Sequence, residues 1–147
     1  MLVNKNCIIV GASGEIGFNC AKLFYEQGAN LILIYNKNEK IITQFKKEKK
    51  NIVSYKCDLS NEKEIKKIFK KIAGKFPEIN VLVNSAGVME TQNFFLDENL
   101  KNLKKHFDIN ILSAVLLTKL ISRNMIRSQN PSIINISSVA ALSLIHI

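Results

Sequence analysis

The sequence predicts an α/β protein with a doubly wound parallel sheet, because two kinds of apolar pattern alternate along its 147 residues. Short runs rich in β-branched residues predict strands at 7–10, 31–35, 52–55, 79–84 and 132–137. Longer stretches with helical spacing lie between them, at 15–27, 38–50, 61–75 and about 98–127. Apolar strands joined by helices indicate right-handed crossovers and a sheet that is covered on both faces.

Each predicted element has local support in the sequence. CIIV leads through a glycine-rich turn into the first helix, and LILIY and IVSY enclose the second helix. In the third helix the lysines fill one face and the apolar residues form a stripe, made of Ile65, Ile68, Phe69 and Ile72. We expect this helix to begin at Asn61, with Glu64 three residues on, or at Ser60 as the alternative cap. INVLVN and SIINIS supply the last two strands, on either side of the long fourth helix.

The composition fits one globular domain and argues against several other classes. The net charge of +9 comes from lysines spread between apolar positions, so we interpret them as solvated helix faces, with a nucleic-acid surface as a distant alternative. Cys7, Cys20 and Cys57 lack metal-ligand spacing, which predicts buried free thiols, no metal site and a cytoplasmic protein. The first strand starts too early for a signal peptide, and no uninterrupted apolar run approaches about 18 residues, so we expect no membrane span.

Binding residues are expected directly after the strands, since ligands of such sheets bind beyond the carboxyl ends of the strands. The first turn, Gly11-Ala12-Ser13-Gly14-Glu15-Ile16-Gly17, lets the backbone approach a ligand, and the helix that follows attracts a phosphate. A purely structural turn is the alternative. After the second strand, Asn36 and Lys37 offer a cation and no carboxylate, which favours a 2′-phosphorylated cofactor, NADP(H) over NAD(H). A lysine-rich loop without a role is the alternative there.

The later strand ends and the long helix carry further short polar motifs. Cys57-Asp58-Leu59 follows the third strand, where Asp58 is either a binding residue or an acid at a helix start. Asn84-Ser85-Ala86-Gly87 follows the fourth strand, with a plain turn as the alternative. Asn110 lies in an apolar stretch of the long helix, where a structural hydrogen bond is the alternative, and Ser137-Ser138 end the fifth strand. Each motif alone is weak, whereas together and in this order they form a strong signal.

In this order the motifs resemble those of the short-chain dehydrogenase/reductase family, over about residues 3–141. The resemblance implies a Rossmann-type sheet with strand order 3-2-1-4-5 and with later strands missing. The sequence departs from the family pattern at four positions. Val10 replaces a threonine, Glu15 replaces the middle glycine, Asn36 stands where an NAD-selecting Asp would fall, and Ser85 replaces a second Asn.

The resemblance assigns binding roles to the turns. Asp58 would bind the adenine amino group, Leu59 would pack on the adenine ring, and Asn84 would steady the central sheet. The full set of cofactor-binding residues that it implies is Gly11, Ser13, Gly14, Glu15, Ile16, Gly17, Asn36, Lys37, Asp58, Leu59, Asn84, Ala86 and Gly87.

Members of this family transfer a hydride between a nicotinamide and a carbonyl or an alcohol. The resemblance implies that Asn110 orders a water in the proton relay and that Ser138 holds the substrate carbonyl oxygen. The family's acid/base is a Tyr with a Lys one helical turn on, whereas the tyrosines of this sequence are Tyr25, Tyr35 and Tyr55. We therefore expect a C-terminally truncated, inactive chain whose last strand is an exposed edge and lowers its solubility.

We expect residues 1–141 to form an incomplete NAD(P)-binding domain and residues 142–147, LSLIHI, to be a non-native tail. One back-translation of LSLIHI matches the mosaic end of a transposase-made sequencing library, and a natural premature stop is the alternative. We expect the intact parent to be a homo-oligomeric NADP(H)-dependent reductase of a small-molecule or acyl-carrier-bound carbonyl. The LIYNKNE stretch resembles the 3-oxoacyl-[acyl-carrier-protein] reductases of fatty-acid synthesis. The alternative is a non-catalytic NAD(P)-binding regulatory module, which has no need of both Asn110 and Ser138.

Overall fold

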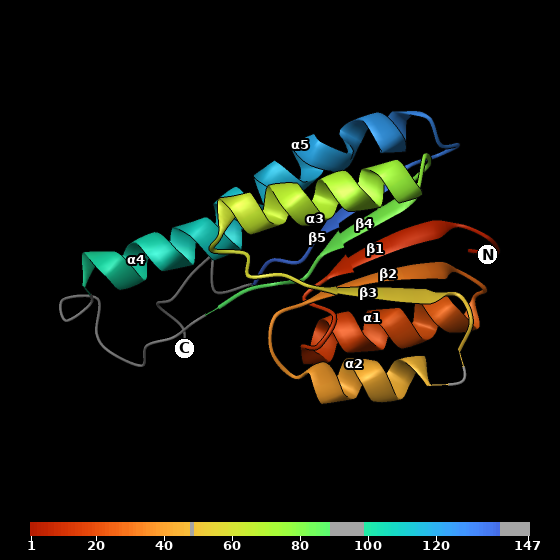
Figure 1. Cartoon of the computed structure of the whole chain (residues 1–147), viewed down its shortest axis with the longest axis horizontal. Helices are drawn as coiled ribbons and strands as arrows, with labels where there is room; N and C mark the ends of the chain where they lie inside the picture. Colours follow the sequence, from red (N-terminus) through yellow and green to blue (C-terminus); the bar gives the residue numbers. More distant parts are fainter. Residues whose placement is uncertain (48, 89–98, 139–147) are drawn as a thin grey trace.

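The computed structural model describes residues 1–47, 49–88 and 99–138, which form a layered α/β domain (Figure 1). The strands are β1 (Asn6–Val10), β2 (Asn30–Tyr35), β3 (Ile52–Lys56), β4 (Val81–Asn84) and β5 (Ser132–Asn135). The helices are α1 (Glu15–Glu26), α2 (Glu39–Lys46), α3 (Glu62–Lys75), α4 (Leu100–Phe107) and α5 (Ser113–Ile126), with a π-helical segment η2 (Asp108–Leu112) between the last two. The sheet is parallel throughout and has the order β3-β2-β1-β4-β5, which confirms the predicted fold and topology.

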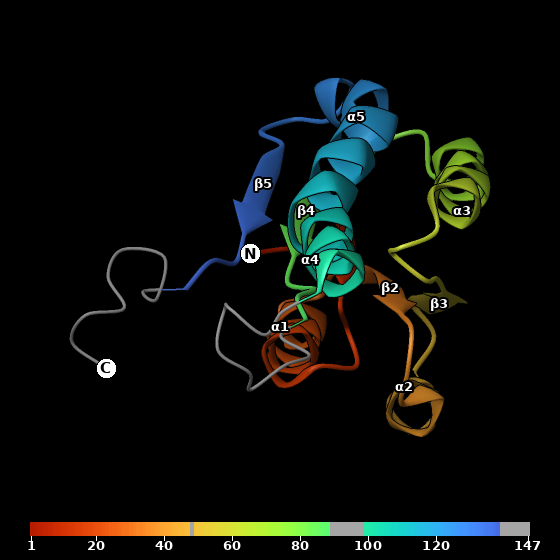
Figure 2. The ribbon, with the colours of Figure 1, turned by 90° about the vertical axis from the view of Figure 1, so that its left-hand side faces the viewer.

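Helices cover both faces of the sheet. Figure 2 shows α1 and α2 on one side and α3 and α5 on the other. The residues of β1 alternate between these two layers: Ile8 and Val10 join the core beneath α3 and α5, and Cys7 and Ile9 join the core beneath α1 and α2. Because every strand runs in the same direction, all the carboxyl ends lie at the same end of the sheet, where the predicted binding residues meet.

The start of α3 distinguishes between the two predicted caps. The side-chain oxygen of Asn61 accepts hydrogen bonds from the backbone N–H groups of Lys63 (3.1 Å) and Glu64 (3.3 Å). Asn61 is therefore the N-cap, and it satisfies two of the donors that a helix start leaves unpaired. Ser60, the alternative cap, instead donates its hydroxyl to Asp58.

The predicted fourth helix, 98–127, contains a change of winding that the periodicity did not predict. The helical path from Leu100 to Ile126 passes through η2, and the backbone N–H of Ser113 reaches back to the carbonyl of Asp108. The hydroxyl of Ser113 also donates to the Ile109 carbonyl at 2.6 Å. Such π-turns insert one residue into a helix and are frequent at functional sites. Here the inserted turn carries Asn110.

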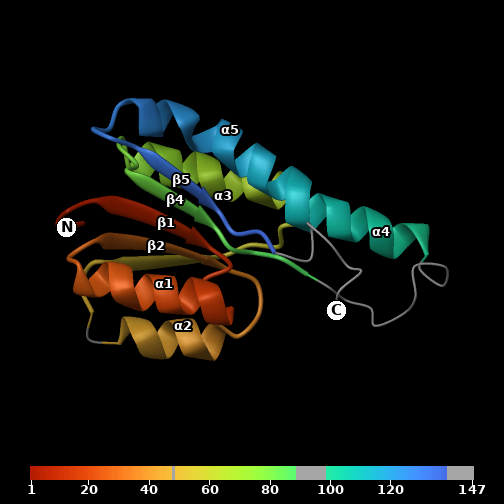
Figure 3. The same cartoon turned by 180° about the vertical axis from the view of Figure 1, so that it is seen from behind.

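The segment Leu100–Ile126 is also long and apolar enough to cross a membrane, judged by length and composition alone. The sequence-based expectation of no span considered only uninterrupted apolar runs. In the fold, Leu117, Ile121 and Met125 of this segment are buried in the core against the sheet. The α5 part of this segment therefore packs on the sheet through one face, whereas α4 has no buried residue. Figure 3 shows α4 extending past the end of the sheet while α5 lies along it.

Candidate functional site

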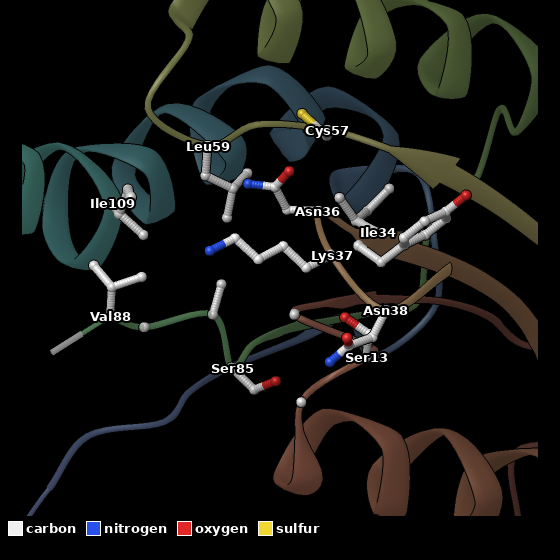
Figure 4. Close-up of a pocket in the computed structure, with 15 residues that line it drawn as sticks. Ser13, Ile34, Asn36, Lys37, Asn38, Cys57, Leu59, Ser85, Val88 and Ile109 are labelled. Carbon is white, nitrogen blue, oxygen red and sulfur yellow. The ribbon is translucent and has the colours of Figure 1, made fainter. Parts of the chain in front are cut away.

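A pocket of about 320 Å³ lies at the carboxyl ends of β1, β2 and β4 (Figure 4). The glycine turn forms one wall, the loop after β2 forms a second, and the turn after β4 forms the floor. Eight of the predicted cofactor-binding residues line it: Gly11, Ser13, Gly14, Asn36, Lys37, Leu59, Ala86 and Gly87. The strand ends therefore bring together most of the side chains that the sequence singled out.

Two glycines of the first turn are required by close backbone contacts. Gly11 has φ +77°, and a Cβ at this position would lie 2.7 Å from the backbone nitrogen of Ala86. A Cβ at Gly17 would lie 2.4 Å from the Gly11 carbonyl oxygen and 2.7 Å from the Ser85 hydroxyl oxygen. The turn after β1 thus packs directly on the turn after β4, and any side chain at these positions would push this wall of the pocket away from its floor.

The N-terminus of α1 opens into this pocket. Gly14 is the N-cap, it has no side chain to cap the helix, and its own N–H bonds the Gly11 carbonyl at 2.9 Å. The N–H groups of the first turn and the helix dipole favour an anion there. With the close backbone approach at Gly11, this cradle fits the pyrophosphate of a dinucleotide.

Glu15 and Ile16, both predicted to bind the cofactor, do not line this pocket. Glu15 borders a neighbouring hollow between α1 and α2, together with Phe18 and Gln44. Ile16 is exposed. Glu15 stands where the family has its middle glycine, yet its carboxylate stays out of the pocket. Helix α1 begins at Glu15, and the Glu15 side chain borders the hollow beside α2 instead.

Three side chains fix the turn after β4 through four hydrogen bonds. The Ser85 hydroxyl donates to the Val10 carbonyl of β1 at 2.8 Å. The Asn84 amide donates to the Asn135 side-chain oxygen of β5, also at 2.8 Å. Asn110 holds Val88 from the helix side: its Oδ1 accepts from the Val88 N–H at 2.8 Å and its Nδ2 donates to the Val88 carbonyl at 2.9 Å.

Asn110 therefore makes structural hydrogen bonds, which is the alternative role that the sequence left open for it. Both polar atoms of its side chain bond the backbone of Val88, which lines the pocket. The π-turn at Asp108–Leu112 carries this side chain on the helix. The ordering of a catalytic water by Asn110 stays a prediction.

Asp58 has a structural role in the turn before α3, ahead of the N-cap Asn61 and so outside the helix start that the sequence offered as its alternative. Its Oδ1 accepts from the backbone N–H of Ser60 at 2.9 Å and from the Ser60 hydroxyl at 2.8 Å, in the turn that leads into α3. Asp58 does not line the pocket, whereas Leu59 does. Contact between Asp58 and an adenine amino group stays a prediction.

A second hollow, of about 470 Å³, lies between β5 and α5. Asn84, Ala86, Asn110, Asn135 and Ser137 are among the residues that line it. Ser138 is exposed directly after this lining and belongs to neither hollow. The two predicted catalytic residues thus lie at the same end of the sheet. The predicted tail, 142–147, lies outside the described residues.

Sequence reasoning missed several residues that line the main pocket. Asn38 had a usable signal, since an Asn before a helix readily takes the left-handed conformation that it shows here, φ 55°. Cys57 and Ser85 lay inside the quoted motifs without a binding role. The sequence did not indicate that Val88 and Ile109 line the pocket, because apolar residues at such positions usually belong to the hydrophobic core. Burial raises the pKa of the Cys57 thiol to about 12, so it contributes packing rather than reactivity.

The sheet order, the glycine turn and the pocket at the strand ends define a Rossmann-type α/β domain. The family model described as short chain dehydrogenase matches residues 5–146, and this chain belongs to that family. It is 31% identical over 144 residues to Short-chain dehydrogenase reductase 3a of Arabidopsis thaliana, covering 95% of this chain and 55% of the relative. The expected family membership is confirmed.

Solved structures show the same fold. A short-chain dehydrogenase/reductase double mutant from Serratia marcescens has a TM-score of 0.86 at 22% identity, over 98% of this chain and 59% of that one. A metagenomic short-chain oxidoreductase in complex with NADP has a TM-score of 0.85 at 26% identity, over 95% of this chain and 64% of that one. This chain spans about half the length of the curated relatives that it matches.

Proposed function

We propose that this chain is the cofactor-binding part of an NADP(H)-dependent oxidoreductase that reduces a carbonyl group to an alcohol. One observation carries the proposal: a glycine cradle, a helix N-terminus and a lysine converge on the pocket at the carboxyl ends of the strands. Family membership supports hydride transfer as the reaction class. The NADP held by the metagenomic relative supports the cofactor class.

The preference for a 2′-phosphorylated cofactor rests on the charge of the pocket wall. Among the described residues that line the pocket, Lys37 carries a charge and the rest are neutral. A carboxylate in this loop would bind the ribose hydroxyls and repel a 2′-phosphate, whereas Asn36 and Asn38 flank the lysine here. We assign the 2′-phosphate to this loop.

The remaining roles follow the order of the strands. A bound nicotinamide would supply the hydride. The first-turn N–H groups of α1 would hold the pyrophosphate, and Ala86 and Gly87 would leave room for the cofactor ribose. Ser138 would hold the substrate carbonyl oxygen, at the end of the sheet where Asn110 fixes the turn after β4. Proton transfer needs the family's Tyr and Lys, a pair that this sequence lacks, so we propose that the chain binds cofactor without turnover.

For the parent protein we propose a 3-oxoacyl thioester as substrate, a homo-oligomeric assembly and a cytoplasmic location. The LIYNKNE resemblance supports the substrate class, and Cys7 and Cys57, buried as free thiols, support a reducing compartment. Cys20 is partly exposed, so the expectation of buried thiols holds for two of the three. A non-catalytic NAD(P)-binding module is the second candidate. The sequence argued against it because such a module does not need Asn110 and Ser138 together, but Asn110 has a structural role here, since its side chain holds the backbone of Val88.

Titration of the purified chain with NADPH and NADH, followed by calorimetry, tests the binding function. Gly17→Ala should abolish binding, because the new Cβ would clash with the Gly11 carbonyl. Gly74→Ala in α3 is the matched control, since its Cβ position faces open space: apart from its chain neighbours and the backbone of its own helix, no atom of the described residues lies within 4 Å. Absence of binding by the unaltered chain at millimolar dinucleotide would overturn the proposal. An assay of carbonyl reduction by the parent protein then distinguishes the two candidates: activity supports the reductase, and its absence supports the non-catalytic binding module.

A further inference from the structure

The first turn of α1 combines two opposite electrostatic features. The first hydrogen bond within the helix runs from the Phe18 N–H to the Gly14 carbonyl at 2.8 Å. The N–H groups that precede it belong to Glu15, Ile16 and Gly17 and have no acceptor within the helix. These groups attract an anion, and the proposed dinucleotide-binding function places the pyrophosphate there. The same turn carries the carboxylate of Glu15, which repels an anion.

The carboxylate of Glu15 makes no ion pair with any other described residue. Glu15 is exposed and borders the hollow between α1 and α2, and the described residues that line this hollow include no cation. Ser13 and Gly14 line both this hollow and the main pocket. The carboxylate therefore lies beside the main pocket, on the turn that would hold the pyrophosphate, and no ion pair within the described part of the chain neutralises it.

The charge of Glu15 stabilises the helix itself. The N-cap of α1 is Gly14, which has no side chain to bond the free N–H groups, whereas Asn61 supplies such bonds at the start of α3. A carboxylate in the first turn interacts favourably with the positive end of the helix dipole, so Glu15 supplies part of the stabilisation that a capping side chain would give. A bound pyrophosphate would interact with the same end of the dipole, where the negative charge of Glu15 is already present.

We propose that Glu15 lowers the affinity of the pocket for the pyrophosphate of a dinucleotide while it stabilises α1. The backbone N–H of this residue contributes to the anion-binding turn, and its side chain opposes the anion through space without contacting it. The effect is the same for NADPH and NADH, because the two dinucleotides share the pyrophosphate and differ only in the 2′-phosphate. This inference rests on the proposed dinucleotide-binding function and adds a residue that sets how tightly the cofactor is held.

Dissociation constants for NADPH and NADH, measured by calorimetry on the purified chain and its variants at low and high ionic strength, test the proposal. Glu15→Gln keeps the size of the side chain and removes its charge. At an ionic strength of about 0.02 M it should tighten the binding of both dinucleotides by roughly threefold, because the first-turn carboxylate and the pyrophosphate lie well within the Debye length. At about 0.5 M, where the Debye length falls to roughly 4 Å, the difference should shrink to less than about 1.5-fold.

Two further variants separate this effect from a general change of charge. Glu15→Lys should tighten binding beyond Glu15→Gln, while the urea midpoint of unfolding should fall from the unaltered chain to Glu15→Gln and again to Glu15→Lys. Glu26→Gln is the matched control, since Glu26 is exposed at the other end of α1, about 16 Å along the helix. It should change both dissociation constants by less than about 1.5-fold. It should also leave the urea midpoint unchanged or raise it, because a carboxylate is unfavourable at the C-terminal end of the dipole.

The outcomes distinguish this inference from the proposed function. If Glu15→Gln leaves both constants unchanged at low ionic strength, or weakens binding, this inference is wrong and the dinucleotide function stands. A gain in affinity that persists at high ionic strength would also overturn it, because the charge of Glu15 would then not be the cause. A gain for NADPH alone would overturn it too, since the effect would then lie at the 2′-phosphate. If neither cofactor binds the unaltered chain or any variant, the proposed function fails and this inference fails with it.

Discussion

The two edges of the sheet are built differently. At the β3 edge, Lys46 donates to the Ser54 hydroxyl at 3.0 Å, and the Lys71 ammonium lies 5.7 Å from the centre of the Tyr55 ring. At the β5 edge, Ile133, Ile134 and Ile136 are each 40–43% exposed. Lysines along an edge strand discourage pairing with another sheet, and bare isoleucines invite it.

The charge distribution sharpens this contrast. The chain has 21 Lys and Arg residues, yet residues 128–147 contain no Lys, Arg, Asp or Glu. Ile133 and Ile134 are adjacent in β5, so they point to opposite faces of the sheet. β5 therefore has the composition of an interior strand of a parallel sheet, covered on both faces, whereas β3 has the composition of an edge.

The largest effect is expected on self-association. Sedimentation velocity should show concentration-dependent assembly of the unaltered chain, and Ile134→Lys should shift it strongly toward monomer by placing a charge on the bare edge. The reciprocal variant, Lys56→Ile on β3, tests the other edge and should increase assembly. If Ile134→Lys assembles as readily as the unaltered chain, the β5 edge is not the associating surface.

The next effect concerns how β5 is attached to its neighbour. Asn84 is buried, and its amide donates to Asn135; its own Oδ1 has no hydrogen-bond partner among the described residues. Asn135→Ala would leave the buried Asn84 amide without a partner, which should lower the unfolding free energy by about 1–3 kcal/mol. Urea unfolding of the unaltered chain and of Asn135→Ala measures this loss of free energy.

A double-mutant cycle supplies the control for this attachment. With Asn84→Ala already in place, Asn135→Ala should cost much less, because the two amides interact directly. Additive losses would contradict the pairing. At the β3 edge no buried amide pair is present within the described part of the chain, so the same substitution strategy has no counterpart there.

The comparison also shows which features sequence alone could predict. The strands followed from apolar periodicity, and most pocket residues followed from turn residues at strand ends, because parallel topology forces these ends together. The strand order was implied by the resemblance to the family. The π-turn at Asn110 and the bonding of Asp58 to Ser60 did not follow, because both depend on which polar partner lies nearest in three dimensions.

A third prediction uses Cys57, which directly follows β3. Burial, with smaller contributions from Glu64 and Asp58, raises the pKa of this thiol from 9.0 to about 12. Between these values the unfolded chain releases a proton that the folded chain keeps, so the contribution is present below pH 9 and is lost as the pH rises toward 12. Unfolding free energies measured from pH 8 to 10.5 should decline less steeply for Cys57→Ala than for the unaltered chain. Parallel declines would contradict the raised pKa.

The smallest effect is expected at the protected edge. Lys71→Ala removes the cation from the Tyr55 ring and should lower the unfolding free energy by about 0.5–1 kcal/mol, the usual size of an exposed cation–π contact. Lys67→Ala is the matched control, since this lysine is exposed on the same helix and makes no such contact within the described structure. Equal losses in the two variants would show that the ring contact adds nothing. If Lys71→Ala instead raised self-association while Lys67→Ala did not, the lysine would protect the β3 edge chiefly by repelling a second sheet, and its role at this edge would be separation rather than stability.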